Sequence, residues 1–238
     1  RGTRVYDSWR RDEFEPLSNE EAADLVADAM DRIPKYCRLQ RVQRDIPADF
    51  IDAGVWKSNL RQLAEQRADE KGYTIRDIRA REVGHNDADP RPQDVELDVT
   101  TYESGGGLEH FISFEDTEQD LIVGFCRLRF PSYSHAAPGA GPAAGGDPIR
   151  RELADAALVR ELHVYGSPAT FDGADIGEGD DGDWQHRGYG RRLLREAEDV
   201  AADAGFEKLS VISGVGVRDY YRDKLGYHQD GPYVSRRL

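Results

Sequence analysis

The sequence is short of several residue types, and each shortage excludes a class of protein. Only two cysteines occur in 238 residues, Cys37 and Cys126. They lie far apart, so they offer neither a disulfide framework nor the closely spaced thiolates that zinc or an iron–sulfur cluster requires. No stretch of about 18 apolar residues is present to span a membrane. We therefore expect no metal site, no membrane partner and a soluble, cytoplasmic protein.

The N-terminus lacks two further features. It has no initiating Met, and it lacks the charged-then-apolar layout of a signal peptide. The first absence suggests that the sequence is a fragment of a longer protein. The second agrees with a cytoplasmic location.

Lysine is scarce as well, with five lysines among 32 basic residues, and 46 acidic residues leave a formal charge of −14. Because an acidic, lysine-poor surface suits hydration in concentrated salt, we expect a halophilic source. Net negative charge ordinarily disfavours a nucleic-acid partner, since phosphate contacts supply most of that affinity. Residues 32–82 differ, with twelve Lys or Arg against eight Asp or Glu. This basic segment either faces a polyanion or is a solvated surface of mixed charge.

Hydrophobic periodicity changes along the chain. A capping box at Ser18–Glu21, followed by apolar residues at helical spacing, predicts a helix over 18–33. The patterns that follow predict a strand over 36–42, a helix over 58–71 and an Arg-rich strand over 75–83. Later alternation predicts an antiparallel meander over 95–101, 111–114 and 121–130. The remaining patterns predict a strand over 156–165, a helix over 188–204, a strand over 208–212, a short helix over 217–225 and a last strand from 227.

Two segments contain few residues that could contribute to a hydrophobic core: the Pro/Gly/Ala-rich residues 131–149 and the acidic residues 166–183. Both are predicted to be loops, and the first is predicted to be mobile. The fold class is therefore α/β (α+β), with a mixed, mostly antiparallel sheet.

A glycine-rich motif begins the helix predicted over 188–204. It reads Q-x-x-G-x-G and is followed by an arginine: Gln185, His186, Arg187, Gly188, Tyr189, Gly190 and Arg191. It resembles the acyl-CoA signature of the GNAT acetyltransferases. Backbone N–H groups at a helix N-terminus and the helix dipole favour a pyrophosphate, and glycine lets phosphates approach the main chain. The alternative is a plain structural turn, although a strand before it and an amphipathic helix after it favour acyl-CoA binding.

The strand before this motif contains Glu161, Leu162, His163 and Val164. Resemblance to the GNAT fold implies that its backbone binds the thioester carbonyl. His163 is either a general base or, as we favour, a residue packed on a strand face. Glu161 shares a face with His163 because strand side chains alternate, and it is a candidate to line a polar pocket.

Tyr220 and Tyr221 lie in the short helix near the C-terminus. GNAT enzymes commonly place a tyrosine hydroxyl there to hold or protonate the departing CoA thiolate. Adjacent helical residues project about 100° apart, so only one of the two is expected to face the thiol. The alternative for both residues is core packing.

Several sequence strings together resemble the catalytic subunit of Elongator and its archaeal relatives. They are Arg41–Pro47, Lys57–Arg61, Arg79–Gly84, Arg160–Gly166, Val211–Gly216 and Gly231–Tyr233. The resemblance covers the chain apart from its two long loops and suggests an archaeal, haloarchaeal member. It implies the end of a radical-SAM barrel over 1–55, a linker over 56–93 and a GNAT domain over 94–238.

The same resemblance implies a function. In that family, a 5′-deoxyadenosyl radical activates the methyl carbon of acetyl-CoA, which adds to C5 of tRNA uridine 34 and gives carboxymethyluridine. This chain would supply acetyl-CoA binding, thioester cleavage and part of the tRNA cleft. The candidate phosphate contacts are Arg41, Arg44, Lys57, Arg61, Arg79 and Arg81.

Two departures from the family pattern limit the expectation. The cysteine triplet for a [4Fe–4S] cluster is absent, so S-adenosylmethionine and the cluster belong to the full-length protein. The linker cysteines that hold zinc in some relatives are absent too. An ordinary GNAT N-acetyltransferase acting on an amine remains an alternative, as does a non-catalytic acyl-CoA sensor or tRNA-binding scaffold. The need for Elongator-type partner subunits stays open.

Overall fold

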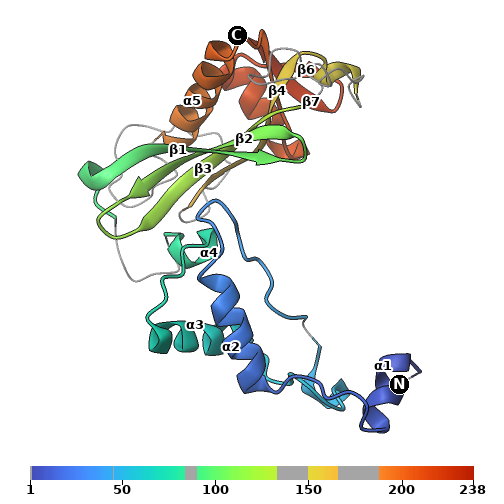
Figure 1. Cartoon of the computed structure of the whole chain (residues 1–238). Helices are drawn as coiled ribbons and strands as arrows, with labels where there is room; N and C mark the ends of the chain where they lie inside the picture. The colour runs from blue at the N-terminus through green and yellow to red at the C-terminus, as the bar shows by residue number, and fades with distance from the viewer. Residues whose placement is uncertain (1, 45, 84–89, 133–149, 166–187) are drawn as a thin grey trace. The chain divides into compact units, whose positions relative to one another are not determined.

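The computed structural model describes residues 2–44, 46–83, 90–132, 150–165 and 188–238. The contacts within the chain divide it into two compact units, residues 1–81 and residues 82–238 (Figure 1). The predicted loops at 131–149 and 166–183 lie almost entirely outside the described residues. No helix in the described ranges is long and apolar enough to cross a membrane.

The first unit is helical. It contains α1 (Arg4–Arg10), α2 (Asn19–Met30), the short 3-10 helix η1 (Ala48–Phe50), α3 (Leu60–Lys71) and α4 (Ile78–Arg81). The capping box is confirmed, because the Ser18 hydroxyl accepts from the Glu21 N–H while the Glu21 carboxylate accepts from the Ser18 N–H. Gly72 ends α3 with a φ of +72°, a left-handed conformation that favours glycine. Helices α2 and α3 pack through Ala22, Ala23 and Leu60.

Two strands predicted in this unit are absent from the described residues. Residues 36–42 form no ladder, because the backbone N–H and C=O of Leu39 bond instead to the side chains of Asp77 and Arg61, each at 3.0 Å. In the segment predicted as a strand over 75–83, Ile78–Arg81 is helical, and the Asp77 carboxylate accepts from the Arg79 N–H at 3.2 Å. Local side-chain capping thus overrides the alternating pattern of this segment.

Within the described residues, the second unit is a seven-stranded sheet with one long helix (Figure 1). The strands are β1 (Val95–Ser104), β2 (Gly107–Asp116), β3 (Leu121–Phe130), β4 (Ala156–Val164), β5 (Lys208–Val211), β6 (His228–Asp230) and β7 (Tyr233–Arg237). Their order is β1-β2-β3-β4-β5-β7-β6, and only β4 and β5 run parallel. The predicted meander and the mixed, mostly antiparallel sheet are confirmed. The helix is α5 (Tyr189–Asp203).

The core of this unit lies between the sheet and α5. From the helix it contains Leu193, Leu194, Ala197 and Ala201, and from the sheet it contains residues of β2 to β5 and β7, among them Ile112, Cys126, Leu128, Val159 and Leu209. The short connecting 3-10 helices are η2 (Pro92–Asp94), η3 (Arg151–Leu153) and η5 (Val215–Val217).

The C-terminal segment differs from the prediction in two respects. The expected single helix over 217–225 is the 3-10 turn η5 followed by a helical segment with a π-turn, η6 (Tyr220–Lys224). The expected single final strand is a hairpin, in which β7 pairs with both β5 and β6. Its turn contains Gly231 at a φ of +58°, and glycine at that position permits the tight reversal.

Candidate active site

The central strands β4 and β5 separate partway along their length. They pair in parallel only between Ala156–Val159 and Lys208–Val211, and one further bond joins the Ile212 N–H to the Val159 C=O at 2.9 Å. Beyond this point the described ladder of β4 continues with β3 alone. The residues predicted to bind the thioester, Glu161–Val164, all lie in this separated part of β4.

A β-bulge determines which β4 side chains face α5. Val159 pairs with Leu128 and Glu161 with Arg127, so Arg160 is an extra residue. After the bulge, Leu162 and Val164 pack against the core on the α5 side. The β4 side chains that line this side of the separated region are therefore apolar.

Glu161 and His163 share the opposite face of the sheet. The Glu161 carboxylate accepts from Arg127 Nε at 3.0 Å, and the His163 ring stacks on Phe125 with ring centres 6.1 Å apart. The two side chains therefore lie on one face of the strand, as strand alternation predicted. Their side chains point away from the α5 core, which favours packing over catalysis for His163 and assigns Glu161 to an ion pair.

The glycine motif is described from Gly188 onward, and Gln185, His186 and Arg187 lie outside the described residues. Gly188 precedes α5 with a φ of +74°, so the backbone itself requires glycine there. A Cβ on Gly190 would meet only Val164 Cγ2, at 3.7 Å, among the described atoms. Packing within the described chain therefore does not demand glycine at 190, and a ligand lying over this turn would explain it.

The first turn of α5 is a suitable anion site. An α-helix leaves its first N–H groups without intrahelical acceptors, and no described side chain caps α5. Arg191 is exposed at this end, while Tyr189 is buried and packs edge-on against Phe114 at 4.8 Å. Backbone donors, the helix dipole and a cation thus meet at the end of α5 beside Val164.

The two tyrosines occupy different environments. Tyr220 is half-buried, whereas Tyr221 is 6% exposed and belongs to the core with Cys126. Burial raises the pKa of Tyr221, so its phenol stays protonated at neutral pH. No hydrogen bond of the Tyr221 hydroxyl is found among the described residues, although buried tyrosine hydroxyls usually have a partner. A ligand in the β4–β5 opening could supply it.

A charged group that the sequence analysis did not identify supports the helix of Tyr221. Tyr227 donates through its hydroxyl to Glu198 of α5 at 2.7 Å, and Arg236 of β7 donates to the same carboxylate at 3.2 Å. The Tyr227 N–H donates to the Tyr221 C=O at 3.1 Å. These residues are distant in sequence, and no local pattern signals their contact.

The predicted tRNA-contact residues fall into two groups. Arg41 and Arg44 are exposed, and Lys57 is half-buried with its Nζ 3.7 Å from Glu20. Arg79 is also half-buried. Of these, Arg41 and Arg44 best present a guanidinium to a large ligand.

Arg61 is half-buried and Arg81 is buried. Arg61 Nη2 bonds Asp77 at 2.9 Å and its Nε bonds Glu65 at 2.7 Å, while Asp77 is fully buried. Arg81 is only 2% exposed. Arg61 stabilises a buried carboxylate and Arg81 is covered, so these two side chains are less suited to a phosphate contact than Arg41 and Arg44.

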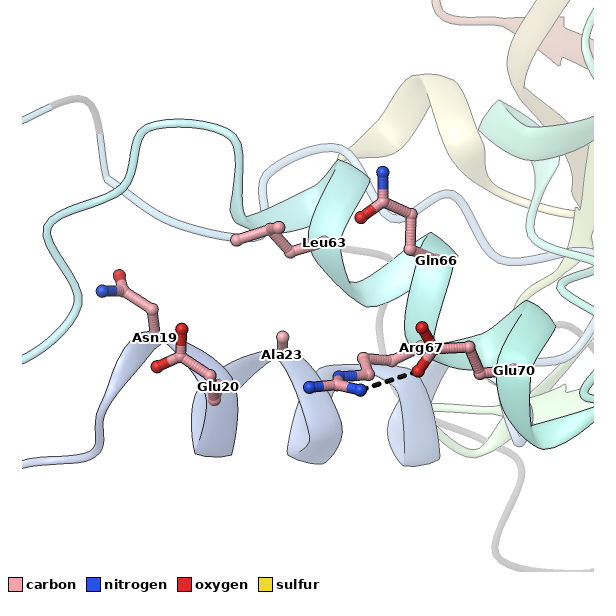
Figure 2. Close-up of a pocket in the computed structure, with 7 residues that line it drawn as sticks. All are labelled: Asn19, Glu20, Ala23, Leu63, Gln66, Arg67 and Glu70. Atoms are coloured by element: carbon pink, nitrogen blue, oxygen red, sulfur yellow. Dashed lines mark hydrogen bonds and ion pairs between the residues drawn. The ribbon is translucent and has the colours of Figure 1, made fainter.

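A cavity of about 180 Å³ lies between α2 and α3 (Figure 2). It is lined by Asn19 and Glu20 of α2 and by Leu63, Arg67 and others of α3. Asn19 Oδ1 already accepts from the N–H groups of Trp56 and Lys57. The cavity contains none of the predicted site residues. In the described part of the chain, no group of three or more His, Cys, Asp or Glu side chains could hold a metal ion.

Two family models match the chain. The Radical_SAM C-terminal domain matches residues 1–70, and the acetyltransferase (GNAT) family matches residues 181–227. The second match spans the glycine motif, α5, the tyrosines and Tyr227. The chain therefore contains a segment similar to the GNAT acetyltransferases, which follows a segment similar to the Radical_SAM C-terminal domain.

Comparison with curated proteins shows similarity along the whole chain. The chain is 42% identical over 243 residues to the tRNA uridine(34) acetyltransferase of Methanocaldococcus infernus, and 42% identical over 244 residues to Elongator complex protein 3 of Drosophila melanogaster. Each alignment covers 100% of this chain, but 42% and 40% of the respective relative. The chain is therefore similar over its whole length to part of these tRNA uridine(34) acetyltransferases and of Elongator complex protein 3.

A solved structure is similar to the chain as well. The archaeal Methanocaldococcus infernus Elp3 with an N-terminal deletion superposes with a TM-score of 0.83 at 42% identity, covering 100% of this chain and 53% of that one. The chain thus spans about two fifths of the length of the curated relatives it matches.

Proposed function

We propose that this chain binds acetyl-CoA and cleaves its thioester during modification of uridine 34 in tRNA. The observation that carries the proposal is the separation of β4 from β5 next to the uncapped N-terminus of α5. The separated edge of β4 offers backbone N–H groups to the thioester end of acetyl-CoA. The first turn of α5 offers backbone N–H groups to its anionic pyrophosphate.

The pyrophosphate of acetyl-CoA lies at the first turn of α5. The N–H groups of Gly190 and Arg191 donate to it, and Gly190 leaves room for the phosphates above Val164. The acyl arm extends along the separated part of β4, where main-chain N–H groups orient the thioester carbonyl. Leu162 and Val164 exclude water on the α5 side.

Tyr221 is the residue we assign to the departing thiolate. Its pKa is raised by burial, so its hydroxyl remains a hydrogen-bond donor across the physiological pH range. A phenol at this position stabilises the developing negative charge on sulfur as the carbon–sulfur bond breaks. Tyr220 packs edge-on against Tyr221, with ring centres 5.9 Å apart, and fixes its orientation.

The tRNA substrate is proposed from two observations. The relatives are named tRNA uridine(34) acetyltransferase, and residues 32–82 are net basic in an otherwise acidic chain. Arg41 and Arg44 are the surface groups that we assign to phosphate contacts, and Lys57 and Arg79 belong to the same basic segment.

The radical step belongs to the longer protein. The match to a Radical_SAM C-terminal domain supports the use of S-adenosylmethionine and a [4Fe–4S] cluster there. This chain carries only two cysteines, one of them buried. The proposal for the chain itself is therefore limited to acetyl-CoA binding, thioester cleavage and part of the tRNA surface.

One experiment separates this proposal from its alternatives. The purified chain is incubated with acetyl-labelled acetyl-CoA, with and without tRNA, and the fate of the label is measured. We expect thioester cleavage stimulated by tRNA. Transfer of the label to an amine would indicate an ordinary N-acetyltransferase, and binding without cleavage would indicate an acyl-CoA sensor or a tRNA-binding scaffold.

A further inference from the structure

Two consecutive residues of β4, Arg160 and Glu161, extend their side chains to the same face of the sheet. Arg160 reaches Glu109 of β2, and Glu161 reaches Arg127 of β3. Consecutive residues of a regular strand point to opposite faces, so this arrangement requires the bulge at Arg160. Both bulge residues are therefore held by an ionic contact.

The bulge determines to which face of the sheet each later side chain of β4 points. With the extra residue in place, Leu162 and Val164 face the apolar core, while His163 lies against Phe125 on the opposite side. Loss of the bulge would shift the strand by one residue and reverse these faces. Glu161 and His163 would then point toward the apolar core, and the backbone groups of the proposed thioester site would be displaced.

Glu109 is the fixed end of the contact made by Arg160. Its side chain is 1% exposed and bonds Arg129 Nη1 at 2.8 Å, as well as Arg160 Nε and Nη2 at 3.2 and 3.1 Å. A buried carboxylate is strongly disfavoured without such partners. The guanidinium of Arg160 thus spans β3 and ties the bulge to β2.

Glu109 has a second partner, Arg129, which lies outside β4. Arg129 lies on β3 and also donates to the C=O groups of Ser104 and Gly105, which hold the β1–β2 turn. The two arginines therefore bind one carboxylate, but only Arg160 belongs to the strand of the proposed thioester site. This difference provides a matched control.

We propose that Arg160 is a positioning residue, whose ion pair with Glu109 locks the β4 bulge and so holds the main chain of residues 161–164 in register for acetyl-CoA. The inference rests on the proposed function and names a residue that acts through the strand without touching the ligand. Arg127 and Glu161 add a second contact at the same bulge.

The test compares Arg160→Gln with Arg129→Gln in the 238-residue chain. Calorimetry measures acetyl-CoA affinity, thermal unfolding measures stability, and hydrogen exchange follows the amides of residues 161–164. We expect Arg160→Gln to weaken acetyl-CoA binding by about 10- to 100-fold, the range for a small misplacement of a binding group, and to speed exchange in β4. Arg129→Gln should bind acetyl-CoA within about twofold of the parent at a similar loss of stability.

Two further results decide the outcome. Arg160→Lys, which keeps the charge but loses the forked geometry, should recover part of the lost affinity. If both Gln variants lose affinity in proportion to stability, or if neither loses it, Arg160 is a structural residue only and the proposal is overturned. If the parent chain fails to bind acetyl-CoA, the proposed function fails instead, and the exchange rates in β4 still report whether Arg160 locks the bulge.

Discussion

Replacing Tyr221 with Phe should separate stability from chemistry. The substitution removes one oxygen that makes no hydrogen bond to a described residue, from a residue that is only 6% exposed. Because the hydroxyl makes no hydrogen bond within the described residues, its removal should change the free energy of unfolding by less than about 1 kcal/mol. At about 2–4 °C for each kcal/mol in a domain of this size, the melting temperature should stay within about 4 °C of the parent.

The same variant should lose activity. If the Tyr221 hydroxyl assists the departing thiolate, tRNA-stimulated cleavage of acetyl-CoA should fall about 100-fold, which corresponds to about 2.7 kcal/mol of transition-state stabilisation. Acetyl-CoA affinity should change little, because the main-chain contacts remain. Label release and calorimetry on one protein preparation measure both quantities.

Two neighbouring tyrosines are the controls. Tyr220→Phe should retain cleavage to within a few-fold of the parent. Tyr227→Phe loses the 2.7 Å bond to Glu198 and should destabilise the protein by about 1–3 kcal/mol. Parental cleavage by Tyr221→Phe would refute the assignment, and a loss confined to Tyr220→Phe would transfer the role to that residue.

Three further outcomes are expected. Gly190→Asp should fold with an unchanged or raised melting temperature, because its Cβ has room and a carboxylate suits the first helical turn, yet it should weaken acetyl-CoA binding at least tenfold by calorimetry. Reversal of Arg41 and Arg44 to Glu should weaken tRNA binding and flatten its salt dependence, measured by titration over a salt series, without changing acetyl-CoA affinity. Burial and the bond to Glu198 raise the pKa of Tyr227 above its ordinary value of 10.0, so its contribution to stability is present below pH 10 and lost as pH rises further. The melting temperature should therefore fall above pH 10, and less steeply in Tyr227→Phe.

Local patterns predicted much of the second unit. The meander, β4, α5 and β5 follow from alternation and from the glycine motif, because strongly periodic segments with clear turn residues fold as their local pattern indicates. Gly188 and the capping box at Ser18 were predictable for the same reason. The similarity of the chain to tRNA uridine(34) acetyltransferases and to the GNAT family was predictable from its motifs.

Residues whose environment depends on distant partners were less predictable. Asp77 caps a helical turn in a segment with a strand-like pattern, and it forms an ion pair with Arg61, a candidate phosphate contact. The bulge at Arg160 has no sequence signature, although it decides that Leu162 and Val164 face the core. Which tyrosine is buried likewise depended on the π-turn in η6, which alternation and helical spacing do not reveal.

The single parallel pairing in the sheet has a consequence for folding. Strands β1 to β3 pair with partners close in sequence, whereas β4 meets β5 only after residues 166–187 and α5 have intervened. Long-range parallel pairing closes a larger loop and forms more slowly than local hairpins. We expect the meander to form early and the β4–β5 junction to form late. The opening that we assign to acetyl-CoA is therefore completed near the end of folding, and nascent chains should acquire ligand affinity only after α5 and the C-terminal hairpin have assembled.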